Sequence, residues 1–123
     1  MTAQVLVVED SPTQALRLRL FLEREGLKVT VAKTGQEGID LAQQQLPKAV
    51  VLDVNLPDID GFQVCRALKG NPATVGTPVI MLTVKDRAAD TISGLDAGAD
   101  AYIPKDDFAE ANLVQALRDL SIL

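Results

Sequence analysis

Acidic, hydroxyl and ammonium side chains follow four short apolar runs of this sequence. The run VLVV ends at Glu9 and Asp10, and the run AVVL ends at Asp53. The run VIML is followed by Thr83, and Lys105 comes directly after AYIP. Carboxylates can hold a divalent cation or attack phosphorus, a hydroxyl donates a hydrogen bond, and an ammonium neutralises negative charge. These residue types together are suited to binding and transferring a phosphoryl group.

The metal site that such a set could form contains oxygen ligands alone. The chain has no histidine and a single cysteine, so histidine-based catalysis and histidine metal sites are excluded. Carboxylates about 4 Å apart repel each other by roughly 4 kcal/mol per pair at an effective dielectric of about 20. If Glu9, Asp10 and Asp53 converge, Lys105 can offset one charge and a divalent cation must offset the rest. Mg²⁺, or Mn²⁺ in its place, is the expected cofactor because it prefers oxygen ligands.

Each of these residues also has an ordinary structural interpretation when it is taken alone. An acid at a strand end is usually only solvated, Thr83 could cap a following helix, and Lys105 could be a surface lysine. The functional interpretation rests on all five residues standing at strand termini.

Short apolar runs alternate with helical periods along the chain. Continuous apolar runs predict strands buried on both faces, and alternation over Leu27–Val31 predicts an edge strand. The predicted strands are 5–8, 27–31, 49–52, 79–82 and 101–103. The predicted helices run over about 12–25, 34–46, 62–69, 87–97 and 107–120.

Helix ends carry local sequence signals. Ser11 before Pro12 predicts an N-cap, Thr34 and Asp107 each begin a predicted capping box, and Gly26 suits the position after a helix end. The apolar positions assigned to the first two helices include Leu16, Leu20 and Leu46.

The order of the elements is (βα)₅, which predicts an α/β fold with a parallel sheet and right-handed crossovers. The favoured arrangement is a flavodoxin-like three-layer sandwich with strand order 2-1-3-4-5. Ligands of such sheets bind where the strand order reverses, here between the first and third strands. Glu9, Asp10 and Asp53 are therefore expected to converge. We expect one domain over residues 1–123, with nothing attached.

Composition and charge exclude several function classes. With 47% hydrophobic and 24% charged residues, the chain is not predicted to be disordered. A net charge of −5 argues against a surface that binds nucleic acid by phosphate attraction. The N-terminus has no basic region, and its apolar run ends in two acids after four residues, so neither a signal peptide nor a membrane anchor is predicted. The cytoplasm is the expected location.

Four motifs in this order resemble the receiver (CheY-like) domain of two-component response regulators. They are VLVVEDS, VVLDVNLPDIDGF, VIMLTV and GADAYIPK, and the resemblance covers essentially all 123 residues. It implies that Asp53 is the phosphoacceptor and takes its phosphoryl group from a sensor histidine kinase or a phosphotransfer protein. It further implies that Asp10 and Asp53 ligate Mg²⁺ directly, that Glu9 acts mostly through a water molecule, and that Asn55 contributes its backbone carbonyl.

The same resemblance implies a conformational switch. Lys105 would pair with Asp53 and later with a phosphoryl oxygen, Thr83 would turn toward the phosphoryl group, and Tyr102 would rotate inward behind it. This shift would reshape the face of the fourth helix, fifth strand and fifth helix, where a downstream target protein would dock. The chain would be a monomer or a weak phosphorylation-dependent dimer. It would catalyse only its own phosphorylation and dephosphorylation.

Two positions depart from the family pattern. Asp106 follows Lys105, whereas the family usually has a proline there with a cis bond. A cis Lys105–Asp106 bond would cost about 3–4 kcal/mol, so both isomers stay open. Val84 follows Thr83 where the family prefers alanine or glycine, which predicts a narrower entrance and slower phosphorylation by small donors.

Three other functions compete with this interpretation. A phosphatase of the haloacid-dehalogenase kind would need an acid two residues after the nucleophile, where this chain has Asn55. A flavodoxin-type FMN carrier would need a phosphate loop after the first strand, where this chain has acids. A degenerate receiver would bind partners without phosphorylation.

Overall fold

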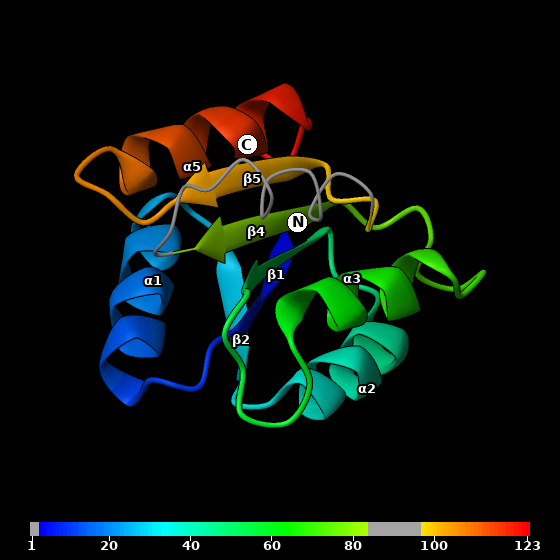
Figure 1. Cartoon of the computed structure of the whole chain (residues 1–123). Helices are drawn as coiled ribbons and strands as arrows, with labels where there is room; N and C mark the ends of the chain where they lie inside the picture. The colour runs from blue at the N-terminus through cyan, green and yellow to red at the C-terminus, as the bar shows by residue number, and fades with distance from the viewer. Residues whose placement is uncertain (1–2, 84–96) are drawn as a thin grey trace.

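A parallel five-stranded sheet forms the centre of the molecule (Figure 1). The computed structural model describes residues 3–83 and 97–123. The strand order is β2-β1-β3-β4-β5, as predicted. The strands are β1 (Gln4–Val8), β2 (Lys28–Ala32), β3 (Ala49–Asp53), β4 (Val79–Thr83) and β5 (Ala101–Pro104). The helices are α1 (Pro12–Arg24), α2 (Gly35–Gln45), α3 (Gly61–Lys69) and α5 (Ala109–Asp119). The helix predicted at about 87–97 lies almost entirely outside the described residues, as does Val84.

Helices cover both faces of the sheet, giving the predicted three layers. Helices α1 and α5 lie on one face, and α2 and α3 lie on the other (Figure 1). Every residue of β3 and β4 is buried, whereas β2 keeps partly exposed positions. This difference confirms that the alternating segment near Leu27–Val31 is an edge strand.

The predicted N-caps at Ser11 and Thr34 are confirmed, although at Thr34 only the N-cap half of the predicted capping box forms. The Ser11 hydroxyl accepts from the Gln14 N–H at 3.4 Å, and Thr34 accepts from the Glu37 N–H at 3.1 Å. Gly26 follows α1 with a φ of 90°, which a residue without a Cβ adopts easily.

The predicted capping box at Asp107 is wrong. Helix α5 begins at Ala109, and its N-cap residue, Phe108, makes no side-chain capping hydrogen bond. The carboxylate of Asp106 instead accepts from the Phe108 N–H at 2.8 Å. A turn closed by this contact displaces the N-cap by one residue, from Asp107 to Phe108.

Leu16, Leu20 and Leu46 do not belong to the core, contrary to the prediction. Their exposed fractions are 54%, 52% and 56%. The buried face of α1 contains Ala15 and Leu22. Leu16 is one residue from Ala15 and Leu20 is two residues from Leu22, so at about 100° per residue both side chains point away from that face. Leu46 lies past the end of α2 in a left-handed conformation.

The loop between β3 and α3 is tied closely to the end of β3. The Gly61 N–H donates to the Val54 carbonyl at 2.8 Å. A Cβ at Gly61 would overlap the Asp53 carbonyl oxygen and lie 2.8 Å from the Val54 Cα. Asp60 and Gln63 form a reciprocal capping box at the start of α3, which was not predicted from the sequence. Helix α3 can therefore begin this close to Asp53 only with glycine at position 61.

Asp58 connects the same loop to the beginning of α2. Its two carboxylate oxygens accept from the backbone N–H groups of Gly35 and Gln36 at 2.8 and 2.9 Å. The hydrogen bond from Gln36 is the largest influence that lowers the pKa of Asp58. The ionised carboxylate therefore joins two helices, α2 and α3, through the loop that follows Asp53.

We expect Gly61→Ala to destabilise the protein by about 1–3 kcal/mol, because the added methyl group must displace backbone atoms. Gly76→Ala is the matched control, since no atom lies within 4 Å of a Cβ built there. Urea unfolding of the two variants checks this expectation, and equal losses of stability would contradict it.

We expect Asp58→Asn to lower the melting temperature at pH 7. The pKa of Asp58 is lower in the folded chain than its ordinary value of 3.8. The stabilisation by this carboxylate is therefore complete above that value and is lost as the pH falls further. Melting curves at pH 7 and pH 3 should show the difference between variant and wild type shrinking at pH 3. A difference that stays constant would overturn this assignment.

Candidate functional site

Three carboxylates meet where β1 and β3 end. Glu9 and Asp10 follow β1, Asp53 is the last residue of β3, and β1 pairs directly with β3. One carboxylate oxygen from each residue lies within 4.8 Å of the others. Glu9 and Asp53 are buried, whereas Asp10 is exposed. The predicted acids are thus brought together, with Asp10 on the open side.

The ammonium of Lys105 lies against these acids. Its Nζ is 3.0 Å from Asp53 Oδ2 and 3.4 Å from Glu9 Oε2. The Lys105 backbone N–H donates to the Thr83 carbonyl. This hydrogen bond holds the backbone of Lys105 beside the end of β4. Among the residues that the structure describes, no peptide bond is cis. The Lys105–Asp106 bond, whose isomer the sequence left open, is therefore trans. With this trans bond the ammonium of Lys105 still reaches Asp53.

Asn55 contacts Asp53 through its backbone. Its N–H donates to Asp53 Oδ1 at 3.2 Å. Each oxygen of Asp53 thus has a hydrogen-bond donor, the Asn55 amide on one and Lys105 on the other. The use of the Asn55 carbonyl as a metal ligand stays a prediction.

Thr83 and Tyr102 share a face of the sheet. Thr83 is buried and pairs with Pro104 in the adjacent strand. Tyr102 lies two residues before Pro104, and side chains two apart on a strand point to the same face. Tyr102 is half-buried and packs against the core cluster that contains Met81. The predicted inward rotation of Tyr102 stays a prediction.

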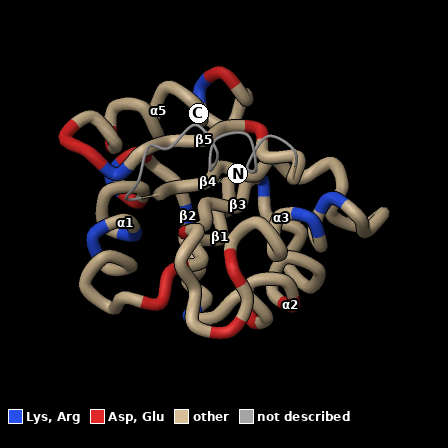
Figure 2. Tube along the Cα trace, viewed as in Figure 1, with Lys and Arg blue, Asp and Glu red and all other residues tan. Residues whose placement is uncertain are grey.

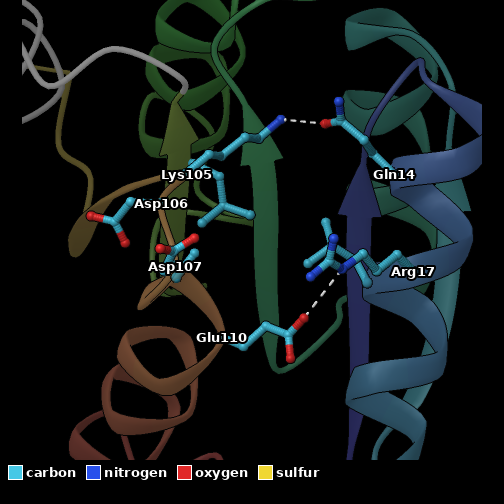
Figure 3. Close-up of a pocket in the computed structure, with 9 residues that line it drawn as sticks. Gln14, Arg17, Lys105, Asp106, Asp107 and Glu110 are labelled. Atoms are coloured by element: carbon cyan, nitrogen blue, oxygen red, sulfur yellow. Dashed lines mark hydrogen bonds and ion pairs between the residues drawn. The ribbon is translucent and has the colours of Figure 1, made fainter.

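The site borders a cavity of about 580 Å³ between α1 and the segment from β5 to α5 (Figure 3). Acidic and basic positions lie side by side along this edge of the molecule (Figure 2). Across the cavity, Lys105 Nζ donates to Gln14 Oε1 at 2.7 Å. Gln14 was not predicted as a site residue. Its spacing from Ser11, three residues earlier, indicates a helix cap instead.

A family model for the response regulator receiver domain matches residues 5–118. The chain belongs to the response regulator receiver family. This membership supports a role as a phosphoacceptor signalling domain of a two-component system.

Named relatives and solved structures resemble this receiver over most of its length. Response regulator MprA of Mycolicibacterium vanbaalenii is 40% identical over 120 residues, which is 98% of this chain and 51% of MprA. The chain therefore spans about half the length of that relative. Protein PilH of Pseudomonas aeruginosa is 39% identical over 103 residues, covering 84% of this chain and 85% of PilH.

Two solved structures have nearly the same fold. A putative response regulator from Chloroflexus aurantiacus superposes with a TM-score of 0.91 at 33% identity, covering 98% of both chains. Chemotaxis response regulator CheY4 of Vibrio cholerae superposes with a TM-score of 0.88 at 28% identity, covering 98% of this chain and 99% of CheY4. In the receiver described here, none of the helices within residues 3–83 and 97–123 is long and apolar enough to cross a membrane. The cytoplasmic location stays a prediction.

The charges of the receiver site fit one divalent cation. When all four groups are ionised, three carboxylates face the single ammonium of Lys105, which leaves two negative charges without compensation. The donor atoms are oxygens, and hard divalent cations such as Mg²⁺ prefer these ligands. The exposed side of Asp10 leaves room for water ligands, which Mg²⁺ usually retains.

A proton can supply part of this missing positive charge. The pKa of Glu9 is raised to about 7, chiefly by burial and further by the hydrogen bond to Asp53 and the negative charge of Asp53, against the opposing charge of Lys105. The ordinary pKa of this side chain is 4.5. The folded, metal-free receiver therefore holds a proton between these pH values that the unfolded chain releases.

We expect the stability of the metal-free receiver to fall as the pH rises from about 4.5 to about 7. The folded pKa of Glu9 is raised, so its stabilising contribution is complete below the unfolded value and is lost as the pH rises through the folded value. A pKa difference of this size corresponds to a few kcal/mol at most. Urea unfolding in EDTA at pH 5 and pH 8 measures this contribution, with Glu9→Gln as the variant that cannot titrate. Identical pH dependence in wild type and Glu9→Gln would show that this carboxyl is not responsible.

Proposed function

We propose that Asp53 accepts a phosphoryl group from a phosphohistidine on a sensor histidine kinase or a phosphotransfer protein. The observation that supports this most directly is the convergence of Asp53 with two further carboxylates and the Lys105 ammonium. The phosphorylated receiver then controls the binding of a downstream protein.

In the proposed reaction, a carboxylate oxygen of Asp53 attacks the phosphorus atom of the donor. An oxygen–phosphorus bond forms, and the bond between phosphorus and the donor's imidazole nitrogen breaks. The imidazole nitrogen keeps the electron pair of that bond. The product is an acyl phosphate on Asp53, which water later hydrolyses to inorganic phosphate and the free carboxylate.

Mg²⁺, or Mn²⁺, would be held by Asp10 and Asp53, by Glu9 through a water molecule, and by the carbonyl of Asn55. When bound, it would neutralise charge on the carboxylates and on the transferred phosphoryl group. The receiver's own residues orient the nucleophile, since the Asn55 amide and the Lys105 ammonium each donate to one oxygen of Asp53.

Lys105 moves from pairing with Asp53 to pairing with a phosphoryl oxygen as the reaction proceeds. Its backbone is held by the carbonyl of Thr83, so only its side chain needs to follow the new charge. The Thr83 hydroxyl donates a hydrogen bond to another phosphoryl oxygen. Tyr102, on the same face of the sheet, moves inward behind Thr83.

The consequence of this switch would be a changed docking surface, formed by β5, α5 and the helix predicted at about 87–97. Of these elements, β5 and α5 lie within the described residues. The partner is a protein rather than nucleic acid or membrane, and the receiver domain spans residues 1–123 as a monomer or a weak phosphorylation-dependent dimer. The receiver catalyses only its own phosphorylation and dephosphorylation, without turnover of another substrate.

We expect incubation with acetyl phosphate and Mg²⁺ to add one phosphoryl group, detected by intact mass. Asp53→Asn should abolish the addition because the amide is not a nucleophile, and EDTA should abolish it by removing the cation. Asp40→Asn is the matched control, since Asp40 is an exposed carboxylate on α2.

A mass increase that persists in Asp53→Asn would refute the assignment of the acceptor. Full phosphorylation in EDTA would refute the requirement for a metal. Sustained turnover of p-nitrophenyl phosphate would instead identify the chain as a phosphatase.

A further inference from the structure

The Lys105 ammonium has three acceptors in this structure. They are Gln14 Oε1 at 2.7 Å, Asp53 Oδ2 at 3.0 Å and Glu9 Oε2 at 3.4 Å. An ammonium has three N–H donors, so these contacts can occupy all of them. The shortest of the three is the contact to Gln14, which comes from α1 across the cavity (Figure 3).

Gln14 does not serve as the reciprocal cap that its position suggests. It is the third residue of α1 after the N-cap Ser11, where glutamine in a capping box would accept from the Ser11 N–H. That N–H instead donates to Glu9 Oε1 at 3.3 Å. In α3 of the same chain, Gln63 at the equivalent position does accept from its N-cap residue, at 3.1 Å.

The two remaining acceptors of Lys105 are the groups that must change partners during the proposed reaction. Asp53 becomes bonded to phosphorus, and Glu9 turns part of its negative charge toward the cation. Gln14 is neutral, and its helix starts at a capped residue followed by Pro12. It can therefore keep its hydrogen bond to Lys105 while the carboxylates redirect their oxygens.

We propose that Gln14 is a positioning residue that holds the Lys105 ammonium beside the phosphoryl-transfer site. This inference rests on the proposed function, in which Lys105 neutralises charge on the transferred group. Without the amide oxygen, the long lysine side chain has one fewer anchor and spends less time in the position that the reaction needs.

A second side-chain contact across the cavity, which joins α1 to α5, does not replace the contact between Gln14 and Lys105. Arg17 Nε lies 3.3 Å from Glu110 Oε1 across the same cavity, but their side chains are 79% and 44% exposed. Exposed ion pairs of this kind contribute little. Gln14 is itself exposed, but its contact differs because Lys105 has a side chain only 16% exposed and touches the acceptor carboxylate.

The test compares initial rates of phosphorylation by acetyl phosphate at saturating Mg²⁺, so that no protein partner is involved. We expect Gln14→Met to lower the rate by between about twofold and tenfold, the range that corresponds to the net value of one hydrogen bond. Gln14→Glu, which keeps an acceptor oxygen at the same reach, should restore most of the rate. Gln43→Met is the matched control at an exposed position of α2.

A double-mutant cycle separates positioning of Lys105 from a general effect on the fold. If Gln14 acts through Lys105, then Gln14→Met should change the rate less than about 1.5-fold in a Lys105→Ala background. An unchanged rate for Gln14→Met alone, or the same loss in both backgrounds, would overturn the inference. If wild type is not phosphorylated, or Asp53→Asn still is, then the proposed function fails first and the inference fails with it.

Discussion

Electrostatic repulsion at the ends of β1 and β3 is the constraint on which this receiver depends. Two buried carboxylates and one exposed carboxylate share a few ångströms of space with one ammonium. The oxygens of Glu9 and Asp53 are held there by hydrogen bonds from Ser11, Asn55 and Lys105. The site therefore attracts positive charge. A bound proton compensates part of the excess negative charge, and a divalent cation compensates more of it.

The surrounding fold keeps these groups in place by anchoring the backbone on either side of them. Gly61 lets α3 start directly against the end of β3, and Asp58 ties the same loop to α2. On the other side, the carbonyl of Thr83 fixes the backbone of Lys105. Asp53 is thus positioned through α2 and α3 on one side of the site. Lys105 is positioned on the other side by the end of β4.

The sheet and its acidic edge could be predicted because their signals are local or topological. Buried strands are continuous apolar runs, and the sheet order then brings Glu9, Asp10 and Asp53 together. The capping box predicted at Asp107 was wrong because a competing local contact, from the Phe108 N–H to Asp106, closes the turn before α5. Gln14 was not predicted as a site residue because its partner, Lys105, is 91 residues away. No pattern within α1 encodes that distant partner.

The burial of Asp53 also restricts which molecules can react with it. Its exposed fraction is 7%, and Glu9 and Lys105 cover two of its sides. In the proposed reaction, a donor would have to present its phosphorus on a narrow, protruding group and approach past the exposed Asp10. Such a site would favour a slender side-chain donor over a bulky phosphoester, and the burial of Asp53 would shelter the resulting anhydride from most of the bulk solvent.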